Sequence, residues 1–346
     1  MAHWLLLPVV AGLSLVLTDG LRRYALARSL MDIPNARSSH SVPTPRGGGV
    51  AIVASFLLAL PWLAVAGLAS WHLVWALLGA GMGVALLGFL DDHGHVAARW
   101  RLLGHFAAAG WALFWLGGLP PVMVLGHTLD LGWAGHGLAV VYLVWLLNLY
   151  NFMDGIDGLA GVEAICVCLG AAALYALPGM AGGPAVDVWL ALLLACAVAG
   201  FLAWNFPPAR IFMGDAGSGF LGITLGILSL QAAWAAPQLL WSWVILLGVF
   251  VVDATFTLLR RLLRGDKVHQ AHRSHAYQHA ARRFGRHLPV TLTVAAINLG
   301  WLLPIALGVA SGGVEGGVGL LVAYAPLLAL AIKFRAGQPE SRGSDC

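Results

Sequence analysis

Long apolar runs alternate with short polar segments along the whole chain. The runs cover residues 3–18, 48–68, 72–90, 102–119, 136–150, 159–177, 187–204, 217–235, 238–259, 288–310 and 315–333. Most of them approach the roughly 20 residues that an α-helix needs to cross the hydrocarbon core of a bilayer. The pattern therefore predicts an all-α polytopic integral membrane protein with about 11 transmembrane helices.

The composition favours the same fold class. Of the 346 residues, 60% are hydrophobic and only 10% are charged, whereas a soluble globular chain carries about 25% charged residues. So little charge means that most of the surface meets lipid, which makes the bilayer itself a partner. We interpret residues 1–346 as a single transmembrane domain in which residues 334–346 form a short cytoplasmic tail.

The basic residues predict the orientation. If residue 1 lies outside, the inner segments are 19–47, 91–101, 151–158, 205–216, 260–287 and the tail from 334. All 19 Lys and Arg residues fall in these segments or, for Lys333, at the edge of the tail. The positive-inside rule thus places the N-terminus outside and the C-terminus in the cytoplasm. Because the membrane accounts for the net charge of +4, nucleic acid is not an expected partner.

The first apolar run is expected to remain as a membrane span. Its basic residues, Arg22 and Arg23, follow the run instead of preceding it, which is not the order found in a cleaved signal peptide. The four cysteines give no disulfide framework. Cys166 and Cys168 lie one residue apart in an apolar run, where free cysteine packs as a small hydrophobic side chain.

Carboxylates gather at the predicted inner ends of the spans. They are Asp91, Asp92, Asp154, Asp157 and Asp215. Ionisable residues at a membrane boundary usually face a wet cavity or pair with other groups. Since the basic residues select this same side independently, we predict that the acids form one site that faces the cytoplasm.

The residue types in this predicted site suit phosphate chemistry. Clustered carboxylates repel one another unless a cation or protons neutralise them, and Mg²⁺ binds one or two carboxylates together with substrate phosphates. The last large inner segment contains VHQAHRSHAYQHAARR, whose histidines and arginines can donate to phosphate oxygens. The combination is typical of phosphoryl transfer at a water–lipid boundary.

Each motif taken alone also has a structural interpretation. The pair Asp91–Asp92 could cap a helix end. Asp154 and Asp157 would share a face if they were helical, but DGIDG could equally form a turn or a Ca²⁺-like loop. An HRSH segment could simply meet lipid headgroups. Their convergence on one face favours function.

Several other acids are expected to be structural. Asp253, inside the ninth run, is predicted to be a buried polar group bonded between helices. Asp19, Asp32 and Glu163 look like boundary residues, and Glu163 is a candidate cap of the sixth span.

Taken in order, the motifs resemble those of the polyprenyl-phosphate N-acetylhexosamine-1-phosphate transferase superfamily, glycosyltransferase family 4. The matching segments are DIPNARSSHSVPTPRGGG, Asp91–Asp92, NLYNFMDGIDGLAG, NFPPARIFMGDAGS and HRSHAYQH, within residues 30–280. Members move a sugar 1-phosphate from a UDP-sugar onto a membrane lipid phosphate. Eleven spans with an outside start are similar to the branch that initiates O-antigen and related surface glycans.

The resemblance implies roles for the matching residues. Asp215, with Asp154, would hold Mg²⁺ or alternatively Mn²⁺. Asp91, with Asp92 beside it, resembles the position proposed to deprotonate or orient the lipid phosphate. The other implied catalytic residues are Asp154, His272, Arg273 and His275, whose loop would hold the diphosphate or sugar. The implied substrate-binding residues are Asn151, Asp157, Asn205, Phe212 and Arg46, with Phe212 stacking on uracil.

The sequence departs from the family pattern at two places. A third acid that some members carry after the aspartate pair is absent from DDHGH, which puts in doubt a metal site that requires it. The three-histidine loop of the muramoyl-pentapeptide branch is replaced by HRSH. This difference favours a simpler sugar, N-acetylglucosamine, N-acetylquinovosamine or N-acetylfucosamine.

The resulting hypothesis is a Mg²⁺-dependent enzyme of the bacterial inner membrane. It would transfer an N-acetylhexosamine 1-phosphate from a UDP-sugar to undecaprenyl phosphate and release UMP, the first membrane step of an O-antigen-like lipopolysaccharide pathway. The lipid phosphate would attack in one step, with a covalent route through Asp91 as the less favoured alternative. The sequence does not determine the oligomeric state, and a homodimer is one of the alternatives. The alternative function is a cation-coupled transporter, whose acids would lie near the middle of the membrane.

Overall fold

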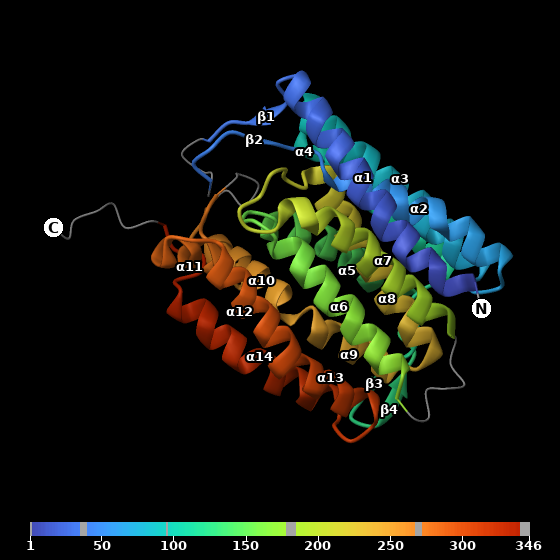
Figure 1. Cartoon of the computed structure of the whole chain (residues 1–346). Helices are drawn as coiled ribbons and strands as arrows, with labels where there is room; N and C mark the ends of the chain where they lie inside the picture. Colours follow the sequence, from blue (N-terminus) through green and yellow to red (C-terminus); the bar gives the residue numbers. More distant parts are fainter. Residues whose placement is uncertain (1, 35–39, 95, 178–184, 267–271, 340–346) are drawn as a thin grey trace.

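Helices form almost all of the regular structure (Figure 1). The computed structural model describes residues 2–34, 40–94, 96–177, 185–266 and 272–339. In chain order the helices are η1 (Ala2–Leu5), α1 (Leu6–Ala27), α2 (Gly49–Val65), α3 (Trp71–Gly94), α4 (Ala98–Leu116), α5 (Gly132–Met153), α6 (Leu159–Tyr175), α7 (Ala185–Asn205), α8 (Asp215–Ala235), α9 (Gln238–Leu246), α10 (Gly248–Leu263), α11 (Ala276–Phe284), α12 (Leu288–Ile297), η2 (Asn298–Leu302), α13 (Leu303–Ala310) and α14 (Gly316–Lys333). The predicted all-α polytopic membrane fold is confirmed.

The described helices differ in how well they could span a bilayer. Within the described residues, seven helical segments are long and apolar enough: α1 with η1, α3, α5, α7, α8, the run from α12 through α13, and α14. The pair α9–α10, bent by 74° at its break, would be an eighth. Helices α2 and α6 are apolar but have 17 residues each. Every predicted apolar run coincides with helix, while the total of eleven spans and the outside N-terminus stay predictions.

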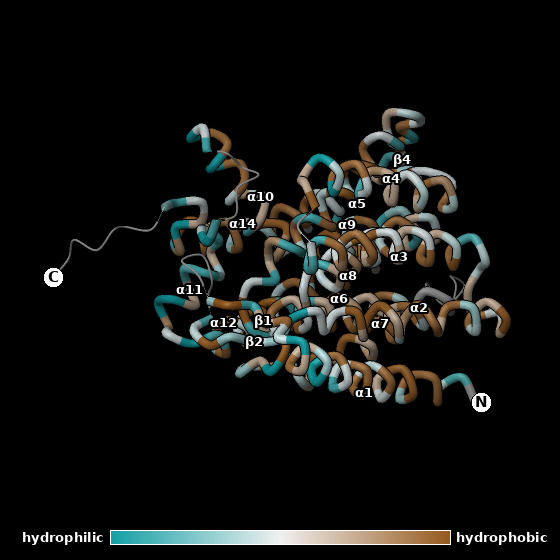
Figure 2. Tube along the Cα trace, turned by 90° about the horizontal axis from the view of Figure 1, so that it is seen from above, coloured by the Kyte–Doolittle hydropathy of each residue, from teal (hydrophilic) through white to brown (hydrophobic). Residues whose placement is uncertain are grey.

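Polar structure gathers at one end of the bundle. There β1 (Met31–Asp32) pairs antiparallel with β2 (Thr44–Pro45), while β3 (Val122–Val124) and β4 (His127–Leu129) pair elsewhere. Figure 1 shows β1, β2 and α11 at the end of the bundle opposite β3, β4 and the N-terminus. In Figure 2 the helix bodies are mostly hydrophobic, and hydrophilic residues collect around β1, β2 and α11.

Helix α8 lies at the centre of the bundle, and 94% of its most apolar stretch is buried. Glycines allow its neighbours to come close. A Cβ on Gly217 would lie 2.6 Å from the Cα of Gly49 in α2, and one on Gly222 would lie 2.7 Å from the Cα of Leu147 in α5. A Cβ on Gly88 in α3 would meet the α8 backbone at 2.5 Å. Small residues permit such close helix packing, which brings the polar ends of α3, α5 and α8 together.

Asp253 joins two helices at the same end. Its Oδ1 accepts a hydrogen bond from the Ala276 N–H at 2.9 Å, and its Oδ2 accepts one from the Tyr277 N–H at 3.0 Å. These are otherwise unsatisfied donors in the first turn of α11. The prediction of a buried polar group bonded between helices is confirmed.

Glu163 is not the boundary residue or helix cap that the sequence suggested. Helix α6 begins at Leu159 with Gly158 as its N-cap, so Glu163 lies inside the helix and is fully buried. Its Oε2 accepts a hydrogen bond from Asn298 Nδ2 in η2. Cys166 and Cys168, on the same helix, are free and buried, as predicted for packing residues.

Candidate active site

Helix ends bring the predicted acids together. Helix α3 ends just after Asp91 and Asp92, α5 ends immediately before Asp154, and α8 begins with Asp215. Gly214, which precedes α8, has a φ of 79°, a conformation that glycine adopts without steric cost. Asp215 therefore lies in the first turn of α8, where the helix dipole favours negative charge.

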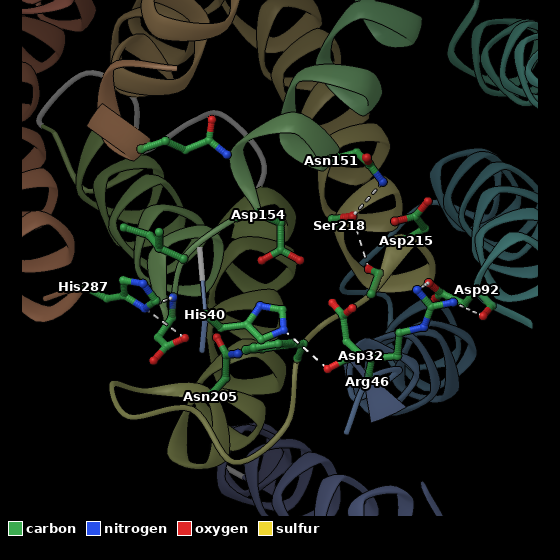
Figure 3. A pocket seen from close by; sticks show the side chains of 16 residues that line it. Asp32, His40, Arg46, Asp92, Asn151, Asp154, Asn205, Asp215, Ser218 and His287 are labelled. Carbon is green, nitrogen blue, oxygen red and sulfur yellow. Dashed lines mark hydrogen bonds and ion pairs between the residues drawn. The ribbon is translucent and has the colours of Figure 1, made fainter. Parts of the chain in front are cut away.

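A cavity of about 360 Å³, the polar cavity, opens between these helix ends and the β1–β2 segment (Figure 3). Its polar or aromatic side chains are Asp32, His40, Arg46, Asp92, Asn151, Asp154, Asp157, Asn205, Phe212, Asp215, Ser218, Gln278 and His287. Each substrate-binding residue implied by the family resemblance lies on this wall. The chain thus gathers residues from five separate segments around one space.

A second cavity of about 510 Å³, the apolar-walled cavity, adjoins the first. Side chains of α3, α4 and α5 form its apolar wall: Val84, Leu87, Leu102 and Leu147. Its charged and imidazole groups are Asp91, Arg101, His105, Asp215, His272 and His275. Asn151, Gly155, Asp215 and Gln278 line both cavities, and we call these residues the junction.

Asp91 and Asp92 face different cavities. Asp92, with a side chain only 4% exposed, lines the polar cavity and lies 3.9 Å from Arg46 Nη1. Arg46 also donates to the main-chain oxygen of Asp92. Asp91 forms an ion pair with Arg101 in the apolar-walled cavity. Arg101 Nη1 lies 3.7 Å from Asp215 Oδ2, so this arginine connects an acid of the aspartate pair with the junction.

The surroundings of Asp154 disfavour its negative charge. Burial, followed by the nearby charges of Asp215, Asp92 and Asp157, raises the pKa of Asp154 well above its usual range. Within the described part of the chain Asp154 takes part in no ion pair. Carboxylates in this situation are relieved by a proton or by a cation.

The carboxylates in and around Asp154 are ligands of the kind that a magnesium ion takes. Among the described residues, no group of three or more His, Cys, Asp or Glu side chains is arranged as a complete metal cage. Mg²⁺ does not need one, because it keeps waters and takes substrate phosphates beside one or two carboxylates. Asp215 and Asp154 supply such carboxylates on the wall of the polar cavity.

Asp157 does not share a helical face with Asp154, because both lie in the connection between α5 and α6. Its Oδ1 lies 3.1 Å from His287 Nδ1, and its Oδ2 accepts the Ala209 N–H at 3.0 Å. Burial alone would raise the pKa of Asp157, but these two partners outweigh burial and hold it below its usual value. Asp157 therefore fastens the loop as well as lining the cavity.

Asn205 and Phe212 shape the same side of the polar cavity. The Asn205 amide bridges two segments, since its Oδ1 accepts the Gly158 N–H at 3.0 Å and its Nδ2 donates to the Ile211 oxygen at 2.9 Å. Phe212 meets the ring of His40 edge-on, with centroids 4.8 Å apart. Phe212 thus contributes an aromatic ring to the wall of the polar cavity.

Two residues of the HRSH segment line the apolar-walled cavity, and Arg273 does not. His272 and His275 stack with ring centroids 4.9 Å apart, and both line the apolar-walled cavity. His275 Nδ1 lies 3.3 Å from Asp253 Oδ1. Burial, with the positive charges of His275 and Arg261 nearby, lowers the pKa of His272 to about 3. Arg273, predicted to act with them, lies on the wall of neither cavity.

Several lining residues were not selected from the sequence: Asp32, His40, Arg101, His105, Ser218, Gln278 and His287. Asp32, predicted to be a boundary residue, lies on the polar cavity because the β1–β2 pairing carries it there. His40, Ser218 and Gln278 stand inside the recognised motifs, which could have indicated them. Arg101, His105 and His287 had no comparable signal, because only helix packing places them here.

Fold and site together define a class of helical membrane proteins in which carboxylates lie where a polar cavity meets an apolar-walled cavity. The model of glycosyl transferase family 4 matches residues 74–233. That range runs from α3 to α8 and contains the aspartate pair and Asp215, but ends before the HRSH segment.

Three relatives match most of the chain and carry names from the same superfamily. The probable undecaprenyl-phosphate N-acetylglucosaminyl 1-phosphate transferase of Bacillus subtilis is 32% identical over 278 residues, which cover 78% of this chain and 75% of the relative. The decaprenyl-phosphate N-acetylglucosaminephosphotransferase of Mycolicibacterium smegmatis is 29% identical over 334 residues, 85% and 78% of the two chains. The phospho-N-acetylmuramoyl-pentapeptide-transferase of Geobacillus kaustophilus is 32% identical over 256 residues, 69% and 75%. The chain therefore belongs to glycosyl transferase family 4, the polyprenyl-phosphate N-acetylhexosamine-1-phosphate transferase superfamily.

Proposed function

We propose that the protein transfers an N-acetylhexosamine 1-phosphate from a UDP-sugar to undecaprenyl phosphate, giving undecaprenyl-diphospho-sugar and UMP. The observation that carries this proposal is the junction, where the polar cavity and the apolar-walled cavity meet. A polar cavity with an aromatic ring suits a nucleotide, and an apolar wall suits a polyprenyl chain. The names of the relatives from Bacillus subtilis and Mycolicibacterium smegmatis pair a polyprenyl phosphate with N-acetylglucosamine.

The reaction moves one phosphoryl group. An oxygen of the lipid phosphate forms a bond to the β-phosphorus of the UDP-sugar. The bond from that phosphorus to the oxygen shared with the α-phosphorus breaks, and UMP leaves with the electron pair. Catalysis of such a transfer is mainly positioning and stabilisation of charge.

Residues of the apolar-walled cavity would handle the acceptor. Arg101 lies between Asp91 and Asp215, where a guanidinium can orient the lipid phosphate by paired hydrogen bonds. Asp91 could accept any proton still on that phosphate, which is a modest general-base role. His272 and His275 would donate to the oxygens of the transferred phosphoryl group, a stabilisation that strengthens as charge develops.

Mg²⁺, or Mn²⁺ in its place, would be held by Asp215 and Asp154 and would draw charge from the diphosphate. Its binding should be visible apart from turnover, because it neutralises crowded carboxylates. Added Mg²⁺ should raise the melting temperature of the chelator-treated protein, and Asp154→Asn should reduce that rise. A melting temperature that does not respond to Mg²⁺ would argue against this site.

We place the reaction in the bacterial inner membrane, with the site toward the cytoplasm, as the first membrane step of an O-antigen-like surface polysaccharide. The deciding assay incubates the purified protein with undecaprenyl phosphate and a panel of radiolabelled UDP-N-acetylhexosamines. Label should move into lipid that organic solvent extracts, with release of one UMP per transfer. Accumulation of label inside sealed vesicles without lipid product would instead identify a transporter.

The same assay without lipid tests the order of steps. A one-step reaction leaves no label on the protein. A stoichiometric phospho-enzyme that Asp91→Asn removes would replace the one-step mechanism by a covalent one.

A further inference from the structure

Gln278 occupies a position at the junction to which none of the roles above is assigned. It lies in the first turn of α11, is 6% exposed, and lines both the polar and the apolar-walled cavity. A residue that borders both cavities is placed beside the part of the substrates that passes from one to the other.

The orientation of the Gln278 amide is fixed by the helix start. The His275 N–H donates to Gln278 Oε1 at 3.2 Å as half of a capping box, and Asp253 anchors the next two N–H groups of α11. The amide nitrogen is thereby directed toward Gly155, where an added Cβ would lie 3.3 Å from Nε2. Within the described part of the chain, the structure records no acceptor for Nε2.

A neutral N–H donor in this place selects the chemistry of its ligand. The phosphoryl oxygens of the transferred group already face carboxylate-bound metal, imidazoles and Arg101 in the proposed function. An amide N–H matches an uncharged oxygen, such as the carbonyl of an acetamido group. Because only the sugar 1-phosphate passes the junction, the uncharged acceptor there belongs to the sugar.

We propose that Gln278 is a specificity-determining residue that donates its amide N–H to the acetamido carbonyl oxygen of the transferred sugar. The inference rests on the proposed function and deepens it, since it names the group by which the donor sugar is recognised. A donor that lacks the acetamido group would offer this N–H no acceptor once it has filled the site, which is the costly case for a polar group. The site should therefore prefer an N-acetylhexosamine over the corresponding hexose.

The experiment compares the full-length wild type with Gln278→Glu and Gln278→Leu. Glu keeps an oxygen that can accept the His275 N–H but has no N–H to donate, whereas Leu removes both functions. Dissociation constants of UDP, UDP-glucose and UDP-N-acetylglucosamine are measured by titration calorimetry with Mg²⁺ present. UDP has no sugar, so it reports the integrity of the rest of the site.

We expect the preference for UDP-N-acetylglucosamine over UDP-glucose to fall about fivefold to tenfold in both variants, as for the loss of one hydrogen bond. A general weakening by the added charge of Glu affects both sugars and cancels in this ratio. A ratio preserved in Gln278→Glu would overturn the inference, even if Gln278→Leu changed it, because the helix start alone would then explain the residue.

The wild type separates this inference from the proposed function. If it transfers a sugar 1-phosphate to lipid but binds the hexose and the N-acetylhexosamine donors equally, the role of Gln278 is wrong and the function stands. If it transfers none from the whole donor panel, the proposed function fails and the inference falls with it.

Discussion

Two groups of acids at the same end of the bundle have opposite surroundings. Asp157 and Asp253 each have fixed partners, namely an imidazole and main-chain N–H groups. Asp154 and Asp215 face the cavities, where Asp154 has no ion pair among the described residues and Asp215 has Arg101 at 3.7 Å. The first pair, the scaffold acids, holds segments together; the second pair, the ligand-facing acids, is left for a ligand.

The difference teaches how one residue type serves two purposes. A carboxylate satisfied inside the protein contributes to stability, and removing it leaves its partners unpaired. A carboxylate surrounded by other carboxylates costs free energy until a cation arrives. Substitutions should therefore act mainly on activity for the ligand-facing acids and mainly on stability for Asp253, with Asp157 in between.

Asp215→Asn should have the largest effect. It removes the acid that lies on both cavities, so we expect transfer to fall by at least about 10³-fold, comparable with the loss of a principal stabiliser of transition-state charge. Folding should be retained, because the change also removes repulsion. The measurement is label transfer into lipid together with the melting temperature, and near-normal turnover would contradict the metal assignment.

Asp253→Asn tests the opposite side of the comparison. The variant loses the ion pair with His275 and weakens the anchor of α11, so the free energy of unfolding should fall by about 3 kcal/mol. Thermal unfolding in detergent measures this loss. Transfer measured well below the melting temperature should fall less than in Asp215→Asn. A stable but inactive Asp253→Asn protein would move this residue into the site.

The sequence predicts the residue types at this end of the bundle better than it predicts the contacts between their side chains. Apolar runs and basic segments depend on the bilayer, which acts on every residue in the same way, so the helices and their polar end follow from the pattern. The same pattern also allowed us to predict that the acids lie together at one side of the membrane. The sequence does not show which acid has a partner in the protein, because Asp154 and Asp157 stand in one motif and both line the polar cavity, and they differ through the contacts of Asp157 with His287 and Ala209.

Packing partners distant in sequence were equally hidden. Arg101 reaches Asp91 and Asp215 because glycines bring α3 against α8. Glu163 was misjudged since its partner, Asn298, is 135 residues away. Arg273 is the opposite case: it matches the family motif and was predicted to be catalytic, but it lies on the wall of neither cavity.

Asp157→Asn should have an intermediate effect, because Asp157 belongs to the scaffold acids and also lines the polar cavity. Loss of its charge-assisted bond to His287 should raise KM for the UDP-sugar about tenfold, with a smaller change in kcat, and cost about 1 kcal/mol of stability. The matched control is His287→Gln. If Asp157 acts only through this contact, the double variant should equal either single one, and additive losses in KM would show a separate contact of Asp157 with the nucleotide.

His272 extends the comparison to histidines and should give the smallest effect. His275 has Asp253 as a partner, whereas the pKa of the partly buried His272 is lowered to about 3. His272 is thus neutral in the folded protein at every pH of a normal assay, while in the unfolded chain it binds a proton below about pH 6.5. Because the unfolded state then holds more protons at this site, the contribution of His272 to stability falls as the pH falls.

Replacing His272 by Gln should remove this part of the acid sensitivity. Between pH 6.5 and pH 5, the wild type should lose up to about 1 kcal/mol more stability than His272→Gln, because solvent screening of this partly exposed group reduces the ideal difference of about 1.6 kcal/mol. Unfolding curves in detergent at the two pH values provide the measurement. Equal losses in the two proteins would mean that folding does not lower the pKa of His272.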